Sequence, residues 1–186
     1  MPGAIFLRGD ELTLRPVEPG DSEFLNRNRN DPRVREWLPR ARPQQRVETE
    51  SRIEGDEDEK GGVTLLACRD GDPVGVVSLF AVSNDSGRAT VSAWIDPEYH
   101  GDGYGTEATE LLVEYAFTER RLHKLVAGAL ADNDPSRAVL ESVGFREEGR
   151  QRDHYFVDGE YRDRVVYGLL KGEWQGDREE PASAES

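Results

Sequence analysis

The feature that most constrains how this chain can fold is a loop with three glycines at alternate positions, directly before a predicted helix, in the segment EYHGDGYGTEA (residues 98–108). Glycine costs backbone entropy, so Gly101, Gly103 and Gly105 indicate a loop that needs dihedral angles or a close backbone approach that side chains would prevent. The first amide groups of a helix have no partner within the helix, and the helix dipole adds positive potential there. We therefore interpret residues 101–106 as a main-chain site for a phosphate group.

Two widespread phosphate-binding motifs do not fit this loop. The dinucleotide fingerprint G-x-G-x-x-G would need a glycine where the chain has Thr106, and no P-loop lysine follows Gly105. The segments before the loop predict an antiparallel meander, because an Asp-Gly turn at 70–71 separates two of its strands. A doubly wound dinucleotide fold would instead require repeated strand–helix–strand units.

Periodicity and helix caps predict the remaining elements. We expect, in order, a strand at 11–17, a helix capped near Asp21 that stops before Pro32, a helical turn at 31–38, a helix at 43–54, three strands between 63 and 95, a helix after the glycine loop, a strand at 124–130, a helix closed by Gly144, and a hairpin that turns at Asp158-Gly159. This describes one domain of the α/β (α+β) class over residues 1–175. A polar tail at 176–186, which we expect to be disordered, follows it, and the acidic segment 54–62 is interpreted as a solvated connector.

The charge of the chain argues against some partners. It has 38 acidic and 24 basic residues and a formal net charge of −14, which repels the phosphates of nucleic acid. Because the acids are spread along the chain, we favour a halophilic-like, salt-adapted surface over attraction of a cationic substrate, and both interpretations stay open. No apolar run approaches the roughly 20 residues that span a bilayer, and no signal pattern is present, so we expect a cytoplasmic protein that does not bind membranes.

Cysteine and histidine give no support to a metal centre. The single cysteine, Cys68, excludes an internal disulfide and a cysteine zinc cluster. His100, His123 and His154 do not share a helical ligand spacing. We therefore expect no metal.

Three segments, in order along the chain, resemble the GCN5-related N-acetyltransferase (GNAT) superfamily, in particular the branch that acetylates the N-termini of ribosomal proteins. The signature Q/R-x-x-G-x-G/A aligns with His100-Gly101-Asp102-Gly103-Tyr104-Gly105. The segment LTLRPVEPGDSEFLNRNRNDPRVREWL (12–38) is similar to the opening of that branch, and residues 132–170 are similar to its ending. The resemblance extends over residues 11–171, nearly the whole chain.

The resemblance implies a fold and an activity. The fold is a mostly antiparallel mixed sheet of about six or seven strands flanked by helices. A V-shaped splay would separate strand 88–95 from strand 124–130 at a bulge near Asp96-Pro97. The activity is direct transfer of an acetyl group from acetyl-CoA to a primary amine, foremost the N-terminal amine of a peptide or protein. A small amine (a polyamine or an antibiotic) as acceptor, a CoA-binding sensor without turnover, and a homodimer through edge strands remain open.

The resemblance also assigns residues. The implied cofactor site consists of Trp94, Ile95, His100, Gly101, Asp102, Gly103, Tyr104, Gly105, Thr106, Asn133, Ser136 and Arg137. The Ile95 N–H would stabilise the oxyanion, Asn133 would bind the pantetheine arm, and Ser136 would protonate the departing thiolate. An alternative role for Asn133 and Ser136 is capping of the helix that follows, and both roles can hold together.

Two positions depart from the family pattern. His100 stands where the signature has glutamine or arginine, which leaves the main-chain site intact. Thr90 stands where many members carry a glutamate that acts on the amine, so the general base is open among Glu98, Asp96, His154 and a water chain. We expect the acceptor to bind between residues 35–38 and the final hairpin, where Glu36, Asp153 and Asp163 add negative charge.

Overall fold

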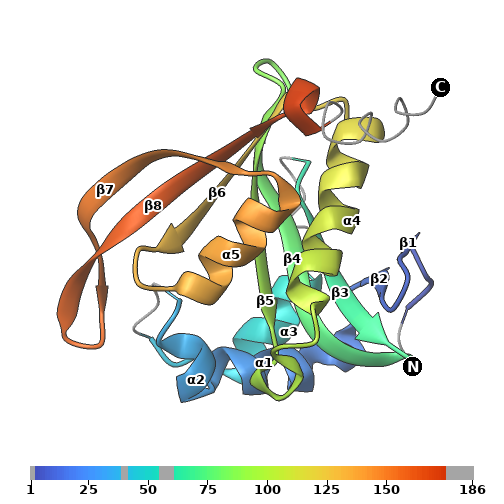
Figure 1. Ribbon diagram of the computed structural model, residues 1–186. Coiled ribbons are helices and arrows are strands. Elements are labelled where there is room, and N and C mark those ends of the chain that lie inside the picture. Colours follow the sequence, from blue (N-terminus) through green and yellow to red (C-terminus); the bar gives the residue numbers. More distant parts are fainter. Residues whose placement is uncertain (1–2, 39–41, 55–60, 175–186) are drawn as a thin grey trace.

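The computed structural model describes residues 3–38, 42–54 and 61–174, and these form one eight-stranded sheet with helices on both faces (Figure 1). The strands are β1 (Leu7–Arg8), β2 (Thr13–Pro16), β3 (Val63–Arg69), β4 (Asp72–Ser83), β5 (Arg88–Ile95), β6 (Lys124–Leu130), β7 (Arg146–Val157) and β8 (Glu160–Leu170). Their order is β1-β2-β3-β4-β5-β6-β8-β7, and only β5 and β6 pair in parallel. The expected tail at 176–186 and most of the acidic segment 54–62 lie outside the described residues.

Five helices and two short 3-10 turns complete the described fold. They are η1 (Pro19–Asp21), α1 (Ser22–Asn30), α2 (Pro32–Arg35), α3 (Arg46–Glu54), η2 (Pro97–Tyr99), α4 (Tyr104–Thr118) and α5 (Asp134–Val143). The expected stop before Pro32 and the closure by Gly144 are confirmed, since α1 ends at Asn30 and Gly144 ends α5 with a left-handed φ of 105°. Asp21 is the N-cap residue of α1 but makes no side-chain cap hydrogen bond, whereas Asp31 caps α2 by accepting from the Arg33 N–H at 2.9 Å. No helix in the described ranges is long and apolar enough to cross a membrane.

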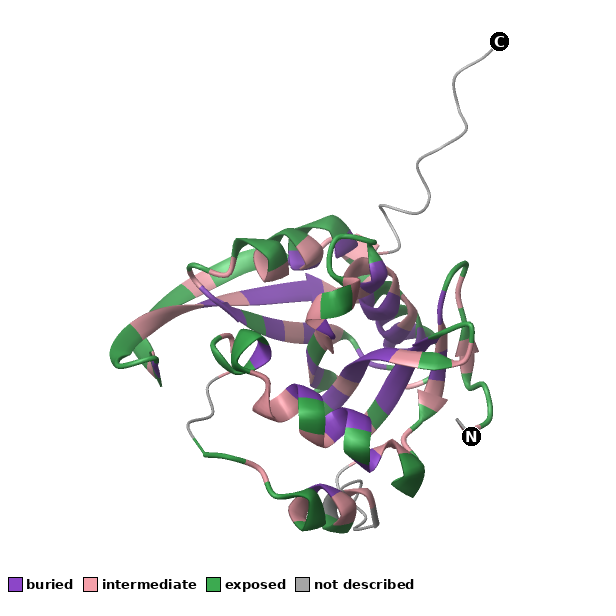
Figure 2. Cartoon of the chain, turned by 90° about the horizontal axis from the view of Figure 1, so that it is seen from below, coloured by how far each residue is buried: buried purple, intermediate pink, exposed green. Residues whose placement is uncertain are grey.

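The sheet separates two layers of helices (Figure 2). On one face α4 and α5 pack through Leu112, Phe117 and Leu140 onto strand residues such as Val77 and Leu125. On the other face a second cluster joins Phe24 and Leu25 of α1 to Leu66, Cys68 and Val76, with Trp94 packed against it. We call these the α4–α5 face and the α1 face.

The strand count exceeds the expected six or seven because of β1. Two residues carry no readable alternation, so sequence periodicity could not identify this strand. Its turn is held by Glu107 of α4, whose Oε1 accepts from the Glu11 N–H at 2.9 Å and the Leu12 N–H at 3.0 Å. The strand therefore depends on a contact made across roughly a hundred residues of sequence.

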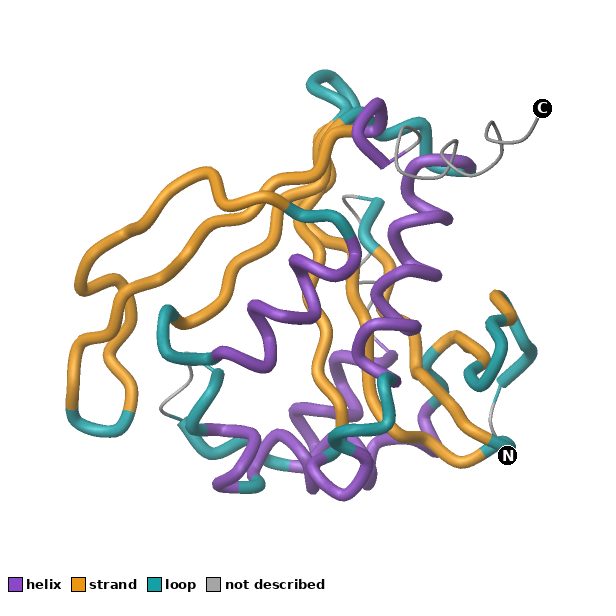
Figure 3. Tube along the Cα trace, in the orientation of Figure 1, coloured by secondary structure: helices purple, strands orange, loops and turns teal. Residues whose placement is uncertain are grey.

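Strands β5 and β6 separate, as the resemblance implied, but not where we expected. Their ladder consists of Arg88–Lys124, Ala89–Leu125 and Thr90–Val126. Beyond these pairs the two strands continue but no longer pair with each other. The tubes of the two strands diverge from this point in Figure 3. We call this unpaired region, residues 91–95 of β5 and 127–130 of β6, the split.

The expected bulge near Asp96-Pro97 is wrong. The β4–β5 ladder stays regular as far as Gly75–Ile95, and its irregularity lies in β4 between Phe80 and Ser83. Strand β6 meanwhile pairs with β8 along its whole length. Since β4 holds β5 and β8 holds β6, the two halves of the sheet diverge immediately after the last shared pair.

Burial should make Cys68 unreactive in the folded protein. Its side chain is 1% exposed, and burial raises the pKa of the thiol to about 11. At pH 8 roughly one thiol in a thousand is then ionised. We expect a thiol-specific reagent to label Cys68 at least about 100-fold more slowly in buffer than in denaturant. Rapid labelling without loss of the circular dichroism signal would contradict this and would show local opening of β3.

Candidate active site

The glycine loop turns the chain from β5 into α4 with two left-handed residues. Gly101 and Gly103 have φ values of 94° and 82°, and Gly103 is the N-cap of α4. A Cβ atom added at either position would meet no atom within 4 Å. The backbone conformation, rather than crowding, therefore requires glycine at these two positions.

Successive backbone amide groups of this loop have no hydrogen-bond partner among the described residues. In the part of the chain that the structure describes, the N–H groups of residues 101–105 donate to no protein acceptor, whereas the Thr106 and Glu107 N–H groups both donate to the Gly103 carbonyl at 3.1 Å. We call the expected main-chain phosphate site the amide cradle. It was expected over residues 101–106, and its free N–H groups are those of residues 101–105. Five unpartnered N–H groups at a helix start form a ready anion site. The Tyr104 side chain takes no part, because it is 4% exposed in the core.

Gly105 marks the point where three elements meet. An added Cβ would lie 3.6 Å from Val139 Cγ2 of α5 and 3.7 Å from Ile95 Cγ1 of β5, which are ordinary contact distances. Its φ is not positive, so neither packing nor backbone geometry requires a glycine here. The absence of a side chain leaves room beside the free amides, the end of β5 and α5.

The open edge of β5 presents Ala93 and Ile95, not Trp94. The Asp96 N–H donates to the Val74 carbonyl at 2.8 Å, and antiparallel partners alternate between bonded and non-bonded pairs. The Trp94 amide therefore faces β4, whereas those of Ala93 and Ile95 face the split. Ala93 is exposed, although Val91 on the same strand face is 3% exposed. Sequence reasoning missed Ala93, because alternation alone does not tell which alternate residues face outward.

The Trp94 side chain has a structural role on the α1 face. Its ring stacks on Phe24 with centroids 5.7 Å apart. This contact anchors α1 to β5 next to the split. Because its ring contacts Phe24 and its amide faces β4, the geometry does not favour the cofactor contact that the resemblance implied for Trp94.

His100 closes the turn that leads from β5 into the glycine loop. Its ring Nε2 lies 2.9 Å from the Ile95 carbonyl oxygen, and the ring is exposed. The Ile95 carbonyl makes this contact, while the Ile95 N–H faces the split, where β5 no longer pairs with β6. His100 can therefore orient the strand end without itself contacting a ligand.

Asp96 is a buried carboxylate whose two oxygens accept three hydrogen bonds. It is 3% exposed. Its Oδ1 accepts from the Glu98 N–H at 3.0 Å, and its Oδ2 accepts from Arg27 Nη2 at 3.0 Å and Asn28 Nδ2 at 3.1 Å. These contacts join α1 to the start of the glycine loop. Such a carboxylate positions the loop and is poorly placed to collect a proton from a substrate.

Asn133 and Ser136 lie at the start of α5, close to this meeting point. The Asn133 Oδ1 accepts from the Ser136 N–H at 3.1 Å, so Asn133 is the helix cap. Neither Asn133 Nδ2 nor the Ser136 hydroxyl has a protein partner within the described ranges, and both stay available to a ligand. Ser136 is one helical turn before Val139, the residue nearest to Gly105 on this helix.

Arg137, which the resemblance assigned to the cofactor, donates hydrogen bonds within the protein. Its Nε donates to the Tyr167 hydroxyl at 3.0 Å and its Nη1 to the Ala131 carbonyl at 3.3 Å, and the Tyr167 hydroxyl donates to Glu141 Oε1 at 2.9 Å. The hydrogen bond to Tyr167 raises the pKa of Arg137, and burial raises the pKa of Tyr167. This network docks α5 on β8, so the geometry does not favour the predicted role of Arg137 at a cofactor phosphate.

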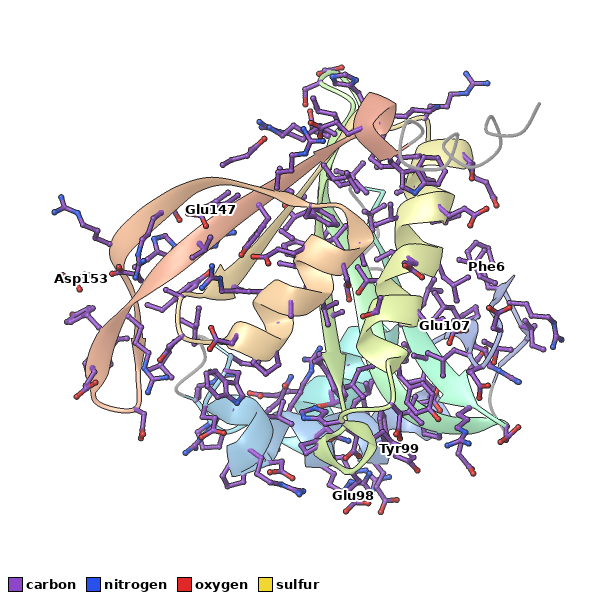
Figure 4. The ribbon with its side chains drawn as sticks, viewed as in Figure 1. Phe6, Glu98, Tyr99, Glu107, Glu147 and Asp153 are labelled. Carbon is purple, nitrogen blue, oxygen red and sulfur yellow. The ribbon has the colours of Figure 1, made fainter. Side chains whose placement is uncertain are left out.

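The base candidates Glu98 and His154 are not brought together. Glu98 lies at the outer side of the glycine loop, whereas Asp153, next to His154, projects from the far side of the β7–β8 hairpin (Figure 4). His154 belongs to an irregular stretch of β7, the edge strand, and two strands separate it from β5. Asp163 holds that stretch: the Asp153 N–H and the Arg150 guanidinium lower the pKa of Asp163.

Asp102 is the one negative charge within the cradle sequence, and its removal should strengthen anion binding. Its side chain is exposed between Gly101 and Gly103. We expect Asp102→Asn to tighten CoA binding about three- to fivefold at low salt, and less than about twofold in 1 M KCl, because salt screens exposed charges. Calorimetry at both salt concentrations measures this, with Glu160→Gln at the distant hairpin as the matched control. Equal affinities of the Asp102→Asn variant and the unmodified protein at low salt would contradict an anion at this loop.

Comparison with known proteins identifies the family. The model of the acetyltransferase (GNAT) domain matches residues 11–146. The "Putative ribosomal N-acetyltransferase YdaF" of Bacillus subtilis is 34% identical over 176 residues, which cover 91% of this chain and 96% of that protein. The spermidine N(1)-acetyltransferase of Escherichia coli is 24% identical over 170 residues, 91% of each chain.

Solved structures of N-acetyltransferases share the fold of this chain. RimJ of Mycobacterium smegmatis, in complex with CoA-disulfide, is 28% identical with a TM-score of 0.80, covering 87% of this chain and 83% of its own. The spermidine N-acetyltransferase of Vibrio cholerae, in complex with CoA and spermine, has a TM-score of 0.85 over 90% of this chain and 99% of its own; at 23% identity it shows the shared fold. The chain therefore belongs to the GNAT family and is an acyl-CoA-dependent N-acetyltransferase.

Proposed function

We propose that this enzyme acetylates the N-terminal amine of a peptide or protein. The observation that carries the proposal is the convergence at Gly105 of the free amides of the loop, the open edge of β5 and the start of α5. The 34% identity to a relative named as a ribosomal N-acetyltransferase supports a protein acceptor.

The cofactor would lie across these three elements. The amides of residues 101–105 would bind the pyrophosphate of acetyl-CoA, and the outward backbone groups of Ala93 and Ile95 would pair with the pantetheine arm. The Asn133 Nδ2, free while its Oδ1 caps α5, would donate to the same arm. The thioester would then lie inside the split, next to Ile95.

Direct transfer follows from this placement. The neutral amine attacks the thioester carbon, a C–N bond forms and the C–S bond breaks, and the Ile95 N–H stabilises the oxygen as it becomes negative. The Ser136 hydroxyl passes its proton to the departing thiolate and takes up a proton from water in the same step. The proton of the amine leaves through water. Of the three predicted side-chain bases, Asp96 is engaged by Arg27 and Asn28, and Glu98 lies nearer to the end of β5 than His154 does.

A small-amine acceptor is the second candidate, since spermidine acetyltransferases are among the relatives. A polyamine needs free carboxylates beside the split. The acids that follow the two strands of the split are already engaged, Asp96 by Arg27 and Asn28, and Asp132 by Arg162 at 3.3 Å. This favours the peptide acceptor. A CoA-binding sensor without turnover is the third candidate.

Thiol release from acetyl-CoA, in high KCl, tests the proposal with a panel of N-terminal peptides and small amines. We expect release that depends on peptides and is absent with N-acetylated versions of the same peptides. Release only with polyamines would establish the second candidate. CoA binding without release would establish the sensor.

Ser136 tests the proposed acid. We expect Ser136→Ala to lower kcat at least about tenfold and to leave the acetyl-CoA KM within about threefold, because the hydroxyl would act in the chemical step. Ser142→Ala, on the same helix and exposed, is the matched control. Full turnover with unchanged acetyl-CoA affinity in Ser136→Ala would exclude the acid role.

A further inference from the structure

Arg164 lies on the α1 face of the sheet, beside the split. In β8 the side chains of Val165 and Tyr167 are buried under α5, and strand residues alternate between faces, so Arg164 points to the opposite face. In β6 the same alternation buries Ala127 and Ala129 on the α5 side and leaves Gly128 on the α1 face. Gly128 belongs to the unpaired part of β6, so it borders the split directly.

Gly128 makes room for the guanidinium of Arg164. A Cβ added at Gly128 would overlap with Nε, Nη2 and Cζ of Arg164, whereas it would not strike any backbone atom that closely. Gly128 pairs with Val166 and the neighbouring Leu130 pairs with Arg164, so the arginine reaches diagonally across β6. The guanidinium is thereby laid over the strand that forms one side of the split.

The hydrogen-bonding capacity of Arg164 is largely unused. Its Nη1 donates to Gln151 Oε1 at 3.2 Å, and its Nε is buried without a partner. Nearby acids have partners of their own: Asp132 pairs with Arg162 at 3.3 Å and Asp163 with Arg150 at 2.7 Å. Among the described residues, no carboxylate lies within ion-pair distance of Arg164, although the chain carries a net charge of −14.

We propose that Arg164 recognises a carboxylate in the first two residues of the acceptor peptide, and so sets the enzyme's preference for acidic N-terminal sequences over polyamines. The inference rests on the proposed function and names its substrate class. An acceptor peptide that enters the split along the open edge of β6 would lie about one strand spacing, roughly 5 Å, from that strand and from the guanidinium over it. That distance matches the side chain of the first or second residue of a peptide. Arg164 Nη2, which donates to no protein acceptor among the described residues, can donate a charge-assisted hydrogen bond to a carboxylate there.

Acetyl transfer to matched peptides tests the inference. One pair has Asp or Asn at position 2, and a second pair has the same exchange at position 5. We expect kcat/KM to favour Asp over Asn at least tenfold at position 2 and less than twofold at position 5. Arg164→Gln should reduce the position-2 preference to less than about twofold, mainly through the peptide KM, and leave the acetyl-CoA KM unchanged.

Two further variants test whether the loss of the Asp preference in Arg164→Gln comes from the guanidinium itself or from a general disturbance of the structure. Gly128→Ala should displace the guanidinium, because its Cβ meets only the end of a flexible side chain, and should weaken the Asp preference in a protein that still folds. Arg152→Gln, an exposed arginine on β7, should retain the full preference.

The outcomes are separable. Transfer to peptides with no Asp preference, or a preference that survives in Arg164→Gln, would overturn the inference and leave the proposed function intact. Efficient transfer to spermidine that is unaffected or lowered by Arg164→Gln would also overturn it. Absence of transfer to every peptide would instead refute the proposed function.

Discussion

Replacing Asp96 with alanine is expected to lower the free energy of unfolding by about 2–4 kcal/mol and acetyl transfer at least about 100-fold. The substitution leaves the buried Asn28 amide and the part-buried Glu98 N–H without their acceptor. The ion pair with Arg27 contributes little to this loss of stability, because the Arg27 side chain is 65% exposed and water screens its charge. The loss of these contacts releases α1 from the start of the glycine loop.

Thermal unfolding and steady-state kinetics measure the two effects. For a chain of this size the stability loss corresponds to a fall in Tm of about 5–12 °C. Asp85→Ala, at an exposed turn between β4 and β5, is the matched control and should change neither quantity. An unchanged Tm would contradict the structural role of Asp96.

Asp96→Asn separates positioning from proton transfer. This variant keeps the shape of the side chain and one acceptor oxygen, but it cannot take up a proton at neutral pH. If Asp96 positions the loop, the pH–rate profile keeps its shape and the CoA affinity falls. Loss of a pH limb with unchanged CoA affinity would make Asp96 the general base and would overturn our assignment.

Replacing Gly105 with valine is expected to weaken CoA binding at least about 100-fold while the protein stays folded. A branched side chain at the meeting point of α4, β5 and α5 would hold a phosphate away from the free amides, and each hydrogen bond to a charged group contributes about 1.5–3 kcal/mol. The fold should tolerate the change, because the first Cβ contacts are at 3.6 and 3.7 Å and the backbone is helical. Helix propensity alone costs less than about 1 kcal/mol.

Calorimetric titration with CoA measures this effect in a graded series. Gly105→Ala adds only the Cβ and should bind CoA within about threefold of the unmodified protein, with equal or higher Tm. Gly172→Val, in the helical turn after β8, is the matched control, since a Cβ there meets nothing within 4 Å. Equal CoA affinity in Gly105→Val and the unmodified protein would place the cofactor elsewhere.

Much of the fold could be read from local patterns. The alternate glycines predicted a helix start with free amides, and Gly101 and Gly103 adopt the left-handed backbone that only glycine takes up easily. Asp-Gly pairs marked the β3–β4 and β7–β8 hairpins, and Gly144 marked the end of α5. These features depend on residues within one or two turns of each other, which is why sequence alone determined them.

The site needed information that no local pattern contains. Which amides of β5 face the split depends on one hydrogen bond, from Asp96 to Val74, and not on the alternation itself. Arg137 looked available for a phosphate until Tyr167 of β8, thirty residues away, proved to be its partner. The order of the strands separates His154 from the end of β5, because His154 lies on the edge strand β7 with β8 and β6 between them. This does not favour His154 as the general base.

The sequence by itself therefore determined the main elements and the run of free amides leading into α4, because caps, turns and periodicity act over short distances, and the resemblance of three segments indicated the family. Only the tertiary structure decided where β5 and β6 separate, which charges near the split are already neutralised, and that Gly128 makes room for Arg164. These outcomes depend on how strands far apart in sequence come to lie side by side, and the burial that this produces decides which donors and acceptors stay free.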